Sequence, residues 1–250
     1  MYIYCKMDMQ FNNLNIYQVY ISKSLEHFNR IENIYNLTNC NTVYDANASC
    51  LFFGMFDHND LTRLSNHRGH RYILWGGSDA DISIYFARTM IMKIKYLPNV
   101  THFAISNNIH QRLNALNIKN IFIDFNLTDT SMFSPLKNVT ATKIYIYNGF
   151  NKGSEKIYGN HLYEQIVKIL PQFEYIYSNT LNIPHSDMPS VYSQCFIGLR
   201  LTTNDGNANT VKEMISMGIP VVHNGDYPES LKWKTIDDIV NHIKNNYKKL

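Results

Sequence analysis

The chain has few cysteines and no long apolar run, and both absences limit the class of protein. Its 250 residues include four cysteines without C-x-x-C spacing, namely Cys5, Cys40, Cys50 and Cys195. We therefore expect reduced thiols rather than a disulfide framework. No stretch of 18 apolar residues is present, and the first ten residues lack the apolar core of a signal peptide. These observations predict a cytoplasmic protein with no transmembrane segment.

An excess of charge is also missing. The chain has 23 Lys and Arg against 20 Asp and Glu, and the formal net charge is +3. Outside the C-terminal Lys244–Lys249 segment the basic residues are scattered, so the sequence predicts no nucleic-acid partner. The sequence contains neither a Walker A loop nor a G-x-S-x-G elbow, which argues against P-loop and serine-hydrolase chemistry.

What the chain does contain is an alternation of short apolar runs and longer helical patterns. The runs, rich in β-branched and aromatic residues, predict strands at 50–56, 72–75, 102–105, 121–124, 143–147, 173–177, 195–201 and 219–223. Amphipathic segments between them predict helices at 60–66, 81–94, 108–116, 158–170, 188–193, 209–217 and 235–248. Nearly continuous apolar strands separated by such helices are typical of α/β proteins with parallel sheets.

Two sheets are favoured over one. The segment 126–142 is irregular and contains Pro135, and the strand–helix pattern restarts after it. We therefore predict two Rossmann-like domains, residues 1–138 and 139–250, with a ligand cleft between them. Before residue 45 the pattern is weaker, with a strand at 15–22 and a helix at 25–36.

Two carboxylates, Asp205 and Glu213, stand out. Asp205 follows the 195–201 strand and is followed by Gly206, while Glu213 lies early in a helix for which Asn209 is the expected N-cap. A Gly218-Ile-Pro turn then leads into the next strand. The two carboxylates of such a unit are able to bind the hydroxyl groups of a sugar nucleotide. The alternative is a turn aspartate beside an unrelated, solvated helical glutamate.

This block resembles the signature of GT-B glycosyltransferases of the retaining family-four type. That family has E-x₇-E ending in Glu-Ala-Met-Ala-x-Gly-x-Pro-Val-Val, and here the first acid is Asp205 and the second Glu213. The resemblance implies that Asp205 binds donor-sugar hydroxyls and that Glu213 holds the ribose. It extends from Cys50 to the end and includes a short helix ending in Tyr192. The family's first strands and Gly-rich loop have no counterpart, so the N-terminal domain is expected to be truncated.

The donor diphosphate needs cations or backbone amides, because negative charge grows on the leaving phosphate. The family supplies an Arg and a Lys after the first strand of its second domain. Here Lys152 follows Gly149, the Arg is missing, and Arg200 is the expected substitute. An exposed loop lysine and a structural arginine are the alternatives, and the loop 183–186 is expected to meet the nucleobase. The expected donor-binding residues are Gly149, Lys152, Ile183, Arg200, Gly206 and Asn207.

A Gly-rich corner, Trp75–Asp81, closes one strand and opens a helix, so its amides suit an anion. The resemblance implies a catalytic role for Asp79, beside Asp205 and Glu213, although the family's neighbouring His is absent; a helix-capping turn is the alternative. The expected acceptor-side residues are Asp57, His58, Gly76, Gly77 and Ser78. Near them, the H-x-x-H in the loop 67–70 lacks helical i,i+4 spacing, and we expect no metal.

The resemblance thus implies a hexosyltransferase-like enzyme that moves a sugar from a nucleotide-sugar donor to an unknown acceptor, with retention and without a metal or other cofactor. The expected partners are the nucleotide sugar and a glycan, lipid or protein acceptor; peripheral contact with a membrane stays open. A catalytically degenerate module that binds a nucleotide sugar or glycan, or supports a partner enzyme, is the main alternative. A sugar-nucleotide 2-epimerase of the same fold is another, but such enzymes are longer and use second-domain histidines in motifs absent here.

Overall fold

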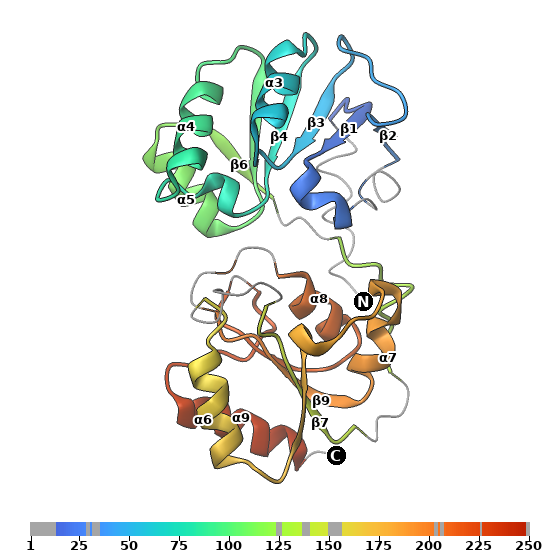
Figure 1. Cartoon of the computed structure of the whole chain (residues 1–250), viewed down its shortest axis with the longest axis vertical. Helices are drawn as coiled ribbons and strands as arrows, with labels where there is room; N and C mark the ends of the chain where they lie inside the picture. The colour runs from blue at the N-terminus through green and yellow to red at the C-terminus, as the bar shows by residue number, and fades with distance from the viewer. Residues whose placement is uncertain are drawn as a thin grey trace. The chain divides into compact units, whose positions relative to one another are not determined.

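The computed structural model confirms an α/β fold with two parallel sheets (Figure 1). It describes residues 14–28, 31, 36–123, 127–136, 141–149, 157–202, 205, 208–225 and 227–248. Two compact units divide the chain, Met1–Leu127 and Thr128–Leu250. The division at residues 138 and 139 that the sequence suggests stays a prediction.

In the first unit the described residues form a six-stranded sheet with the order β2-β1-β3-β4-β5-β6. All neighbouring strands pair in parallel. The strands are β1 (Gln18–Ile21), β2 (Thr38–Asn39), β3 (Cys50–Phe53), β4 (Arg71–Trp75), β5 (Val100–Ala104) and β6 (Asn120–Phe122). Every residue of β3 is buried, as expected for a strand covered on both faces.

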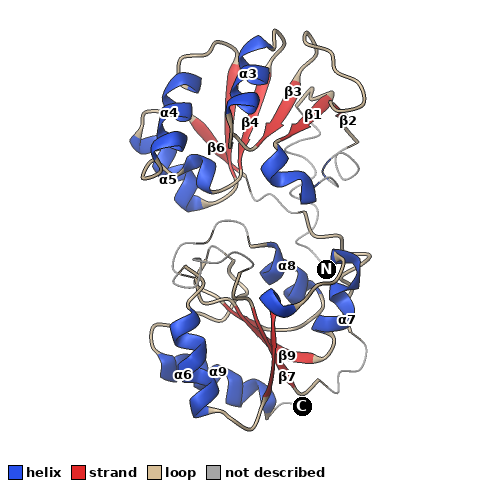
Figure 2. Ribbon diagram, in the orientation of Figure 1, coloured by secondary structure: helices blue, strands red, loops and turns tan. Residues whose placement is uncertain are grey.

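Helices connect these strands and cover the sheet, as Figure 2 shows. The α-helices are α3 (His58–Asn66), α4 (Tyr85–Ile94) and α5 (Asn107–Ala115). Two 3₁₀ helices, η1 (Lys23–Phe28) and η2 (Ser78–Ala80), follow β1 and β4. The core includes Phe52, Ile73 and Trp75, each fully buried.

In the second unit the described residues form a four-stranded parallel sheet with the order β10-β9-β7-β8. Its strands are β7 (Lys143–Ile146), β8 (Glu174–Tyr177), β9 (Cys195–Leu199) and β10 (Val221–Val222). The α-helices are α6 (Asn160–Ile169), α7 (Met188–Tyr192), α8 (Asn209–Ser216) and α9 (Ile236–Tyr247), with 3₁₀ turns η3 (Ser178–Thr180) and η4 (His185–Asp187). Helices α6 and α9 pack on one part of the core, and α7 and α8 on another.

All eight strands predicted after residue 45 are present; β4 and β5 are one residue longer than predicted, and the other six are shorter. The two-residue strand β2 was not predicted, because two residues carry no periodicity. Helix α8 begins at Asn209 itself, and Ala208 occupies the N-cap without a side-chain hydrogen bond. The expectation that Asn209 caps this helix is therefore wrong, because the chain turns one residue earlier.

Within the part of the chain that the structure describes, no helix combines the length and the apolar character needed to cross a membrane. Cys40, Cys50 and Cys195 are buried free thiols. The Sγ atoms of Cys40 and Cys50 lie 3.7 Å apart.

Candidate functional site

Glu213 lies on α8, and a glycine in the neighbouring strand sets the position of this helix. A Cβ atom on Gly198 of β9 would lie 2.6 Å from Sδ of Met214, a fully buried α8 residue. The missing side chain therefore lets α8 pack closely against the sheet. Because Glu213 precedes Met214, this packing also holds Glu213 inside the unit, where its exposed fraction is 4 %.

The buried Glu213 carboxylate has two side-chain partners. Its Oε2 atom accepts a hydrogen bond of 3.1 Å from the Tyr192 hydroxyl at the end of α7. Its Oε1 atom lies 2.7 Å from Nε2 of His185, in η4. Burial and the Glu213 charge raise the pKa of Tyr192 well above its ordinary value, so Tyr192 donates as a neutral phenol. The two partners thus fix the carboxylate in one orientation.

An aromatic cluster supports these partners. The ring of Phe133 lies 5.4 Å from the His185 ring and 6.1 Å from that of Tyr192, between centroids. Tyr145 of β7 meets Tyr192 edge to face at 5.1 Å. Phe133 and Tyr145 are almost fully buried, whereas the His185 side chain is 53 % exposed. The cluster therefore positions Tyr192 and His185, the two partners of Glu213, and leaves His185 partly exposed to solvent.

Arg200, directly after β9, forms an ion pair with Asp205. The pair is bidentate: Nε donates to Oδ2, and Nη2 donates to Oδ1 over 3.1 Å. The guanidinium lies 3.9 Å from the centroid of the Tyr147 ring, in cation–π geometry, and Nη1 is 3.5 Å from the Thr210 hydroxyl. This pair links the end of β9, the loop and the first turn of α8.

Burial alone would favour the neutral forms of both groups. It acts to lower the pKa of Arg200, but the Asp205 carboxylate outweighs it and raises that pKa above its ordinary value. Burial likewise acts to raise the pKa of Asp205, and the guanidinium outweighs it and lowers that pKa. Both groups are therefore charged at neutral pH, and each is the counter-ion of the other.

Further polar groups follow the other strands of this sheet. The Asn148 side chain, after β7, accepts hydrogen bonds of 3.0 Å from the Ser178 hydroxyl and the Asn179 amide, after β8. His223, after β10, lies 3.1 Å through Nδ1 from the Arg200 carbonyl. The carboxyl ends of parallel strands are where α/β proteins bind ligands. None of these three residues was among the predicted site residues; Asn148 and Ser178 directly follow predicted strands, and His223 is the last residue of the predicted strand 219–223.

The predicted donor-binding residues have different outcomes. Gly149 has a φ of +75°, which suits glycine and lets the backbone turn directly after Asn148. Ile183 is 39 % exposed and lies two residues before His185. Lys152, Gly206 and Asn207 lie outside the described residues. Their roles, like those of Asp205 and Glu213, stay predictions.

In the first unit Asp79 braces two strand ends. Its carboxylate, 1 % exposed, accepts hydrogen bonds from the amides of Gly76 and Gly77, after β4, and from the amide of Met55, after β3. These contacts hold the Gly-rich corner, where Gly77 has a φ of +152° and open space at its Cβ position. Asp79 acts here as a positioning group for backbone, and its predicted catalytic role stays untested.

The other acceptor-side predictions fall on the same edge of the first sheet. Asp57 is the N-cap of α3 and accepts from the amides of Asn59 and Asp60. The His58 ring meets that of Phe86 edge to face at 5.1 Å. Because β3 and β4 are neighbours, the loops with Asp57 and His58 and with Gly76, Gly77 and Ser78 follow adjacent strands. Among the described residues no group of three metal-binding side chains gathers.

A pH-dependent stability follows from the buried Asp79. Burial raises the pKa of Asp79 to about 6 from the ordinary 3.8, against the opposing effect of its amide partners. The folded state therefore binds the Asp79 proton more strongly than the unfolded state does. The contribution of this proton to the free energy of unfolding is fully present below the unfolded-state pKa and is lost as the pH rises through about 6. The difference between the raised and the ordinary pKa of Asp79 corresponds to about 3 kcal/mol of unfolding free energy.

Urea unfolding tests this expectation. The Trp233→Phe variant is compared with the Asp79→Asn/Trp233→Phe variant, because the fluorescence of Trp75, the one tryptophan left, reports on the first unit. We expect the loss of unfolding free energy caused by Asp79→Asn to be about 3 kcal/mol smaller at neutral pH than at acid pH. Free energies of unfolding that run parallel over this pH range would contradict it.

Similarity to solved structures indicates the fold to which the chain is related. No family model and no curated protein sequence matches the chain. Among solved structures it is similar to sucrose-phosphate synthase from Thermosynechococcus elongatus, with 13 % identity, a TM-score of 0.55, and coverage of 90 % of this chain and 68 % of that one. It is also similar to TarM, with 12 % identity, a TM-score of 0.57, and coverage of 82 % and 49 %. The chain thus spans about half the length of TarM. These similarities support a GT-B-like fold of two Rossmann-like units.

Proposed function

We propose that the chain is a glycosyltransferase that moves a sugar from a nucleotide-sugar donor to an acceptor, with retention of configuration and without a metal. The observation that carries the proposal is the buried Glu213 carboxylate, held in one orientation by Tyr192 and His185. The GT-B-like fold supports it, because sucrose-phosphate synthase, one of the similar structures, is by name an enzyme of sugar chemistry.

A fixed, desolvated carboxylate suits the vicinal hydroxyls of a ribose. Hydrogen bonds to a charged acceptor are short and about twice as strong as those between neutral groups. Oε1 of Glu213 faces the half-exposed His185, so a ribose hydroxyl reaches this edge by sharing or replacing the histidine contact. In this proposal Glu213 binds the nucleoside, and Ile183 lies in the loop beside it.

The diphosphate would meet the backbone after Gly149 and the cation of Lys152. Arg200 plays a different part in this proposal, because its guanidinium is already bound to Asp205 and lies on Tyr147. The charge of Arg200 is balanced by Asp205, so in this proposal Arg200 holds Asp205 beside the end of β9 and is not a freely moving phosphate ligand. In the first unit the corner around Gly77 and Ser78 would meet the acceptor.

The Arg200–Asp205 pair favours a second candidate, a module that binds a nucleotide sugar without turnover. In the resemblance the first acid binds donor-sugar hydroxyls, but here both oxygens of Asp205 accept from Arg200. A carboxylate with a buried counter-ion has less capacity for sugar hydroxyls. This arrangement leaves nucleoside binding at Glu213 intact and weakens the hold on the sugar.

A panel of UDP-, GDP-, ADP- and TDP-sugars separates the candidates. We expect one base to raise the melting temperature, since a ligand that binds only the folded state stabilises it. Product analysis by NMR, with and without EDTA, then reports turnover, the anomeric configuration and any need for metal. Binding without turnover on any acceptor would select the second candidate. A panel without any shift would overturn both.

A further inference from the structure

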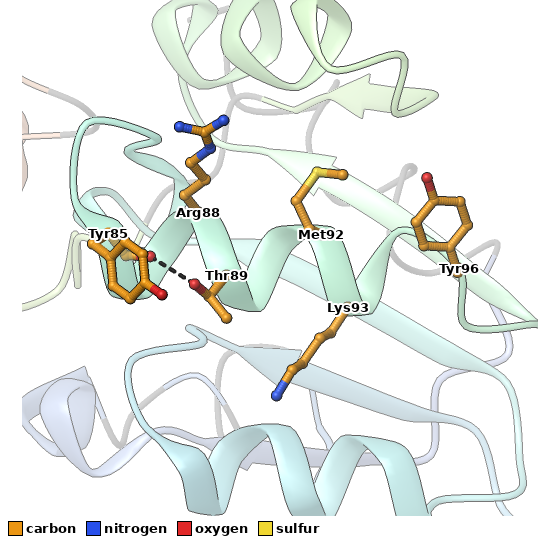
Figure 3. A pocket seen from close by; sticks show the side chains of 6 residues that line it. All are labelled: Tyr85, Arg88, Thr89, Met92, Lys93 and Tyr96. Atoms are coloured by element: carbon orange, nitrogen blue, oxygen red, sulfur yellow. Dashed lines mark hydrogen bonds between the residues drawn. The ribbon is translucent and has the colours of Figure 1, made fainter.

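The outer face of α4 is apolar although it points to solvent. Tyr85 is 85 % exposed, Tyr96 is 73 % exposed, and Met92 between them is 39 % exposed. Together with Arg88, Thr89 and Lys93 they line an open hollow of about 480 Å³, drawn in Figure 3. The opposite face of α4 is also apolar and packs in the core through Ala87, Met90, Ile91 and Ile94. A helix with two apolar faces and only one core is expected to cover a second surface.

Two cations flank this face. Figure 3 shows Arg88 and Lys93 on opposite edges of α4, with Tyr85 and Tyr96 towards its two ends. Thr89 is tied to its own helix, because its hydroxyl donates to the Tyr85 carbonyl over 2.9 Å. Both cations are exposed. The face is therefore an aromatic stripe with a positive charge on each side.

The sequence segment that contains α4 has no negatively charged residue. From Ile82 to Ile123 the sequence has no Asp or Glu, and its basic residues are Arg88, Lys93, Lys95, Arg112 and Lys119. Two of these have structural partners: Arg112 pairs with Asp81 at 3.4 Å, and Lys95 donates to the Leu116 carbonyl over 2.8 Å. Arg88 and Lys93 remain directed to solvent beside the stripe. A partner of this face must therefore be negatively charged as well as apolar.

We propose that the outer face of α4, formed by Tyr85, Arg88, Met92 and Lys93 together with Tyr96 just after the helix, docks on an anionic lipid bilayer. Tyrosine rings prefer the boundary between headgroups and acyl chains, where the ring is buried and the hydroxyl stays hydrated. Lys and Arg at the edges of such a face meet anionic headgroups. Ile84, 44 % exposed at the N-cap of α4, extends the apolar area.

A second copy of the chain fits this face less well, because pairing would oppose like charges on both flanks. The docking does not depend on the proposed glycosyl transfer, since the α4 face shares no residue with the Glu213 site. Failure of either proposal is therefore distinguishable from failure of the other.

Vesicle co-sedimentation of the full chain tests the proposal. We expect binding to vesicles of phosphatidylcholine with phosphatidylglycerol, and little binding to phosphatidylcholine alone. The double variant Arg88→Gln/Lys93→Gln should weaken the partition coefficient about thirtyfold, since each cation near the surface contributes about 1 kcal/mol. Tyr85→Ser/Tyr96→Ser should weaken binding further at high salt, where the apolar contribution remains.

The matched control is Lys168→Gln/Lys244→Gln, which removes two exposed cations from α6 and α9 of the other unit. We expect this variant to bind as the unchanged chain does. Equal loss in both double variants would show a nonspecific charge effect and overturn the docking surface. Absence of vesicle binding, RNA binding by the same residues, or self-association that Tyr85→Ser abolishes would also overturn it. Circular dichroism checks that each variant is folded.

Discussion

Glu213→Gln should weaken the binding of the nucleotide-sugar donor about tenfold to a hundredfold and leave the fold intact. The substitution keeps the volume and an acceptor for the Tyr192 hydroxyl but removes the negative charge. Hydrogen bonds to a charged group contribute about 1.5–3 kcal/mol each, and the proposed ribose contact loses that share. Isothermal titration with the donor from the thermal-shift panel measures the change in dissociation constant.

The control for this substitution is Glu164→Gln, the same chemical change on the exposed face of α6. It should bind the donor with unchanged affinity. A Glu213→Gln variant that keeps full affinity and a normal melting temperature would remove Glu213 from the donor site. His185→Ala separates the two partners of the carboxylate: if His185 only fills the open edge of Glu213, its loss should leave affinity unchanged or improve it.

Asp205→Ala should cost about 3 kcal/mol of stability in the second unit. Removing one partner of a buried ion pair leaves the other charge without compensation, and such losses reach about 3–5 kcal/mol. The side chains of Arg200 and Asp205 are only 10 % and 14 % exposed, so solvent screens the pair weakly. Urea unfolding followed by Trp233 fluorescence, in a Trp75→Phe background, reports on this unit.

The double variant Arg200→Met/Asp205→Ala should recover most of that loss, because no buried charge remains. The effect should also depend on pH. Arg200 holds the pKa of Asp205 below its ordinary value, so the stabilisation is present above the unfolded-state pKa and declines as the pH falls below it. A single variant as stable as the unchanged chain at neutral pH would show that the pair contributes nothing.

The strands and the position of Glu213 could be predicted because each depends on local pattern. Strand β9 is a run of five buried residues, and such runs between amphipathic helices indicate a parallel sheet. The Gly218-Ile-Pro220 turn marks the end of α8, and Glu213 lies about one turn into that helix. Short, nonrepeating elements such as β2 lack this signal.

The partners of the site residues could not be predicted, because they are tertiary contacts. Asp205 and Arg200 were assigned to different parts of the donor, but in the structure their side chains pair with each other. The Asp79 carboxylate accepts from the Met55 amide, 24 residues away, through the pairing of β3 with β4. His185 reaches Glu213 across 28 residues. Residue type and spacing indicate which groups are chemically able to act, whereas packing decides what each one touches.

Short strands at the edges of the two sheets reduce the opportunity for aggregation. An open strand edge offers unpaired amides and carbonyls on which another chain is able to add. Among the described residues β2 and β10 have two residues each and β6 has three, and none of the three contains a charged residue. The outer side of β10 is also occupied, because the Leu231 amide donates to the Val221 carbonyl over 2.8 Å. At these three edges protection against edge-to-edge association therefore comes from brevity and covering, whereas the fourth outer strand, β8, carries the exposed charge of Glu174, which pairs with Lys143 of β7 at 3.2 Å.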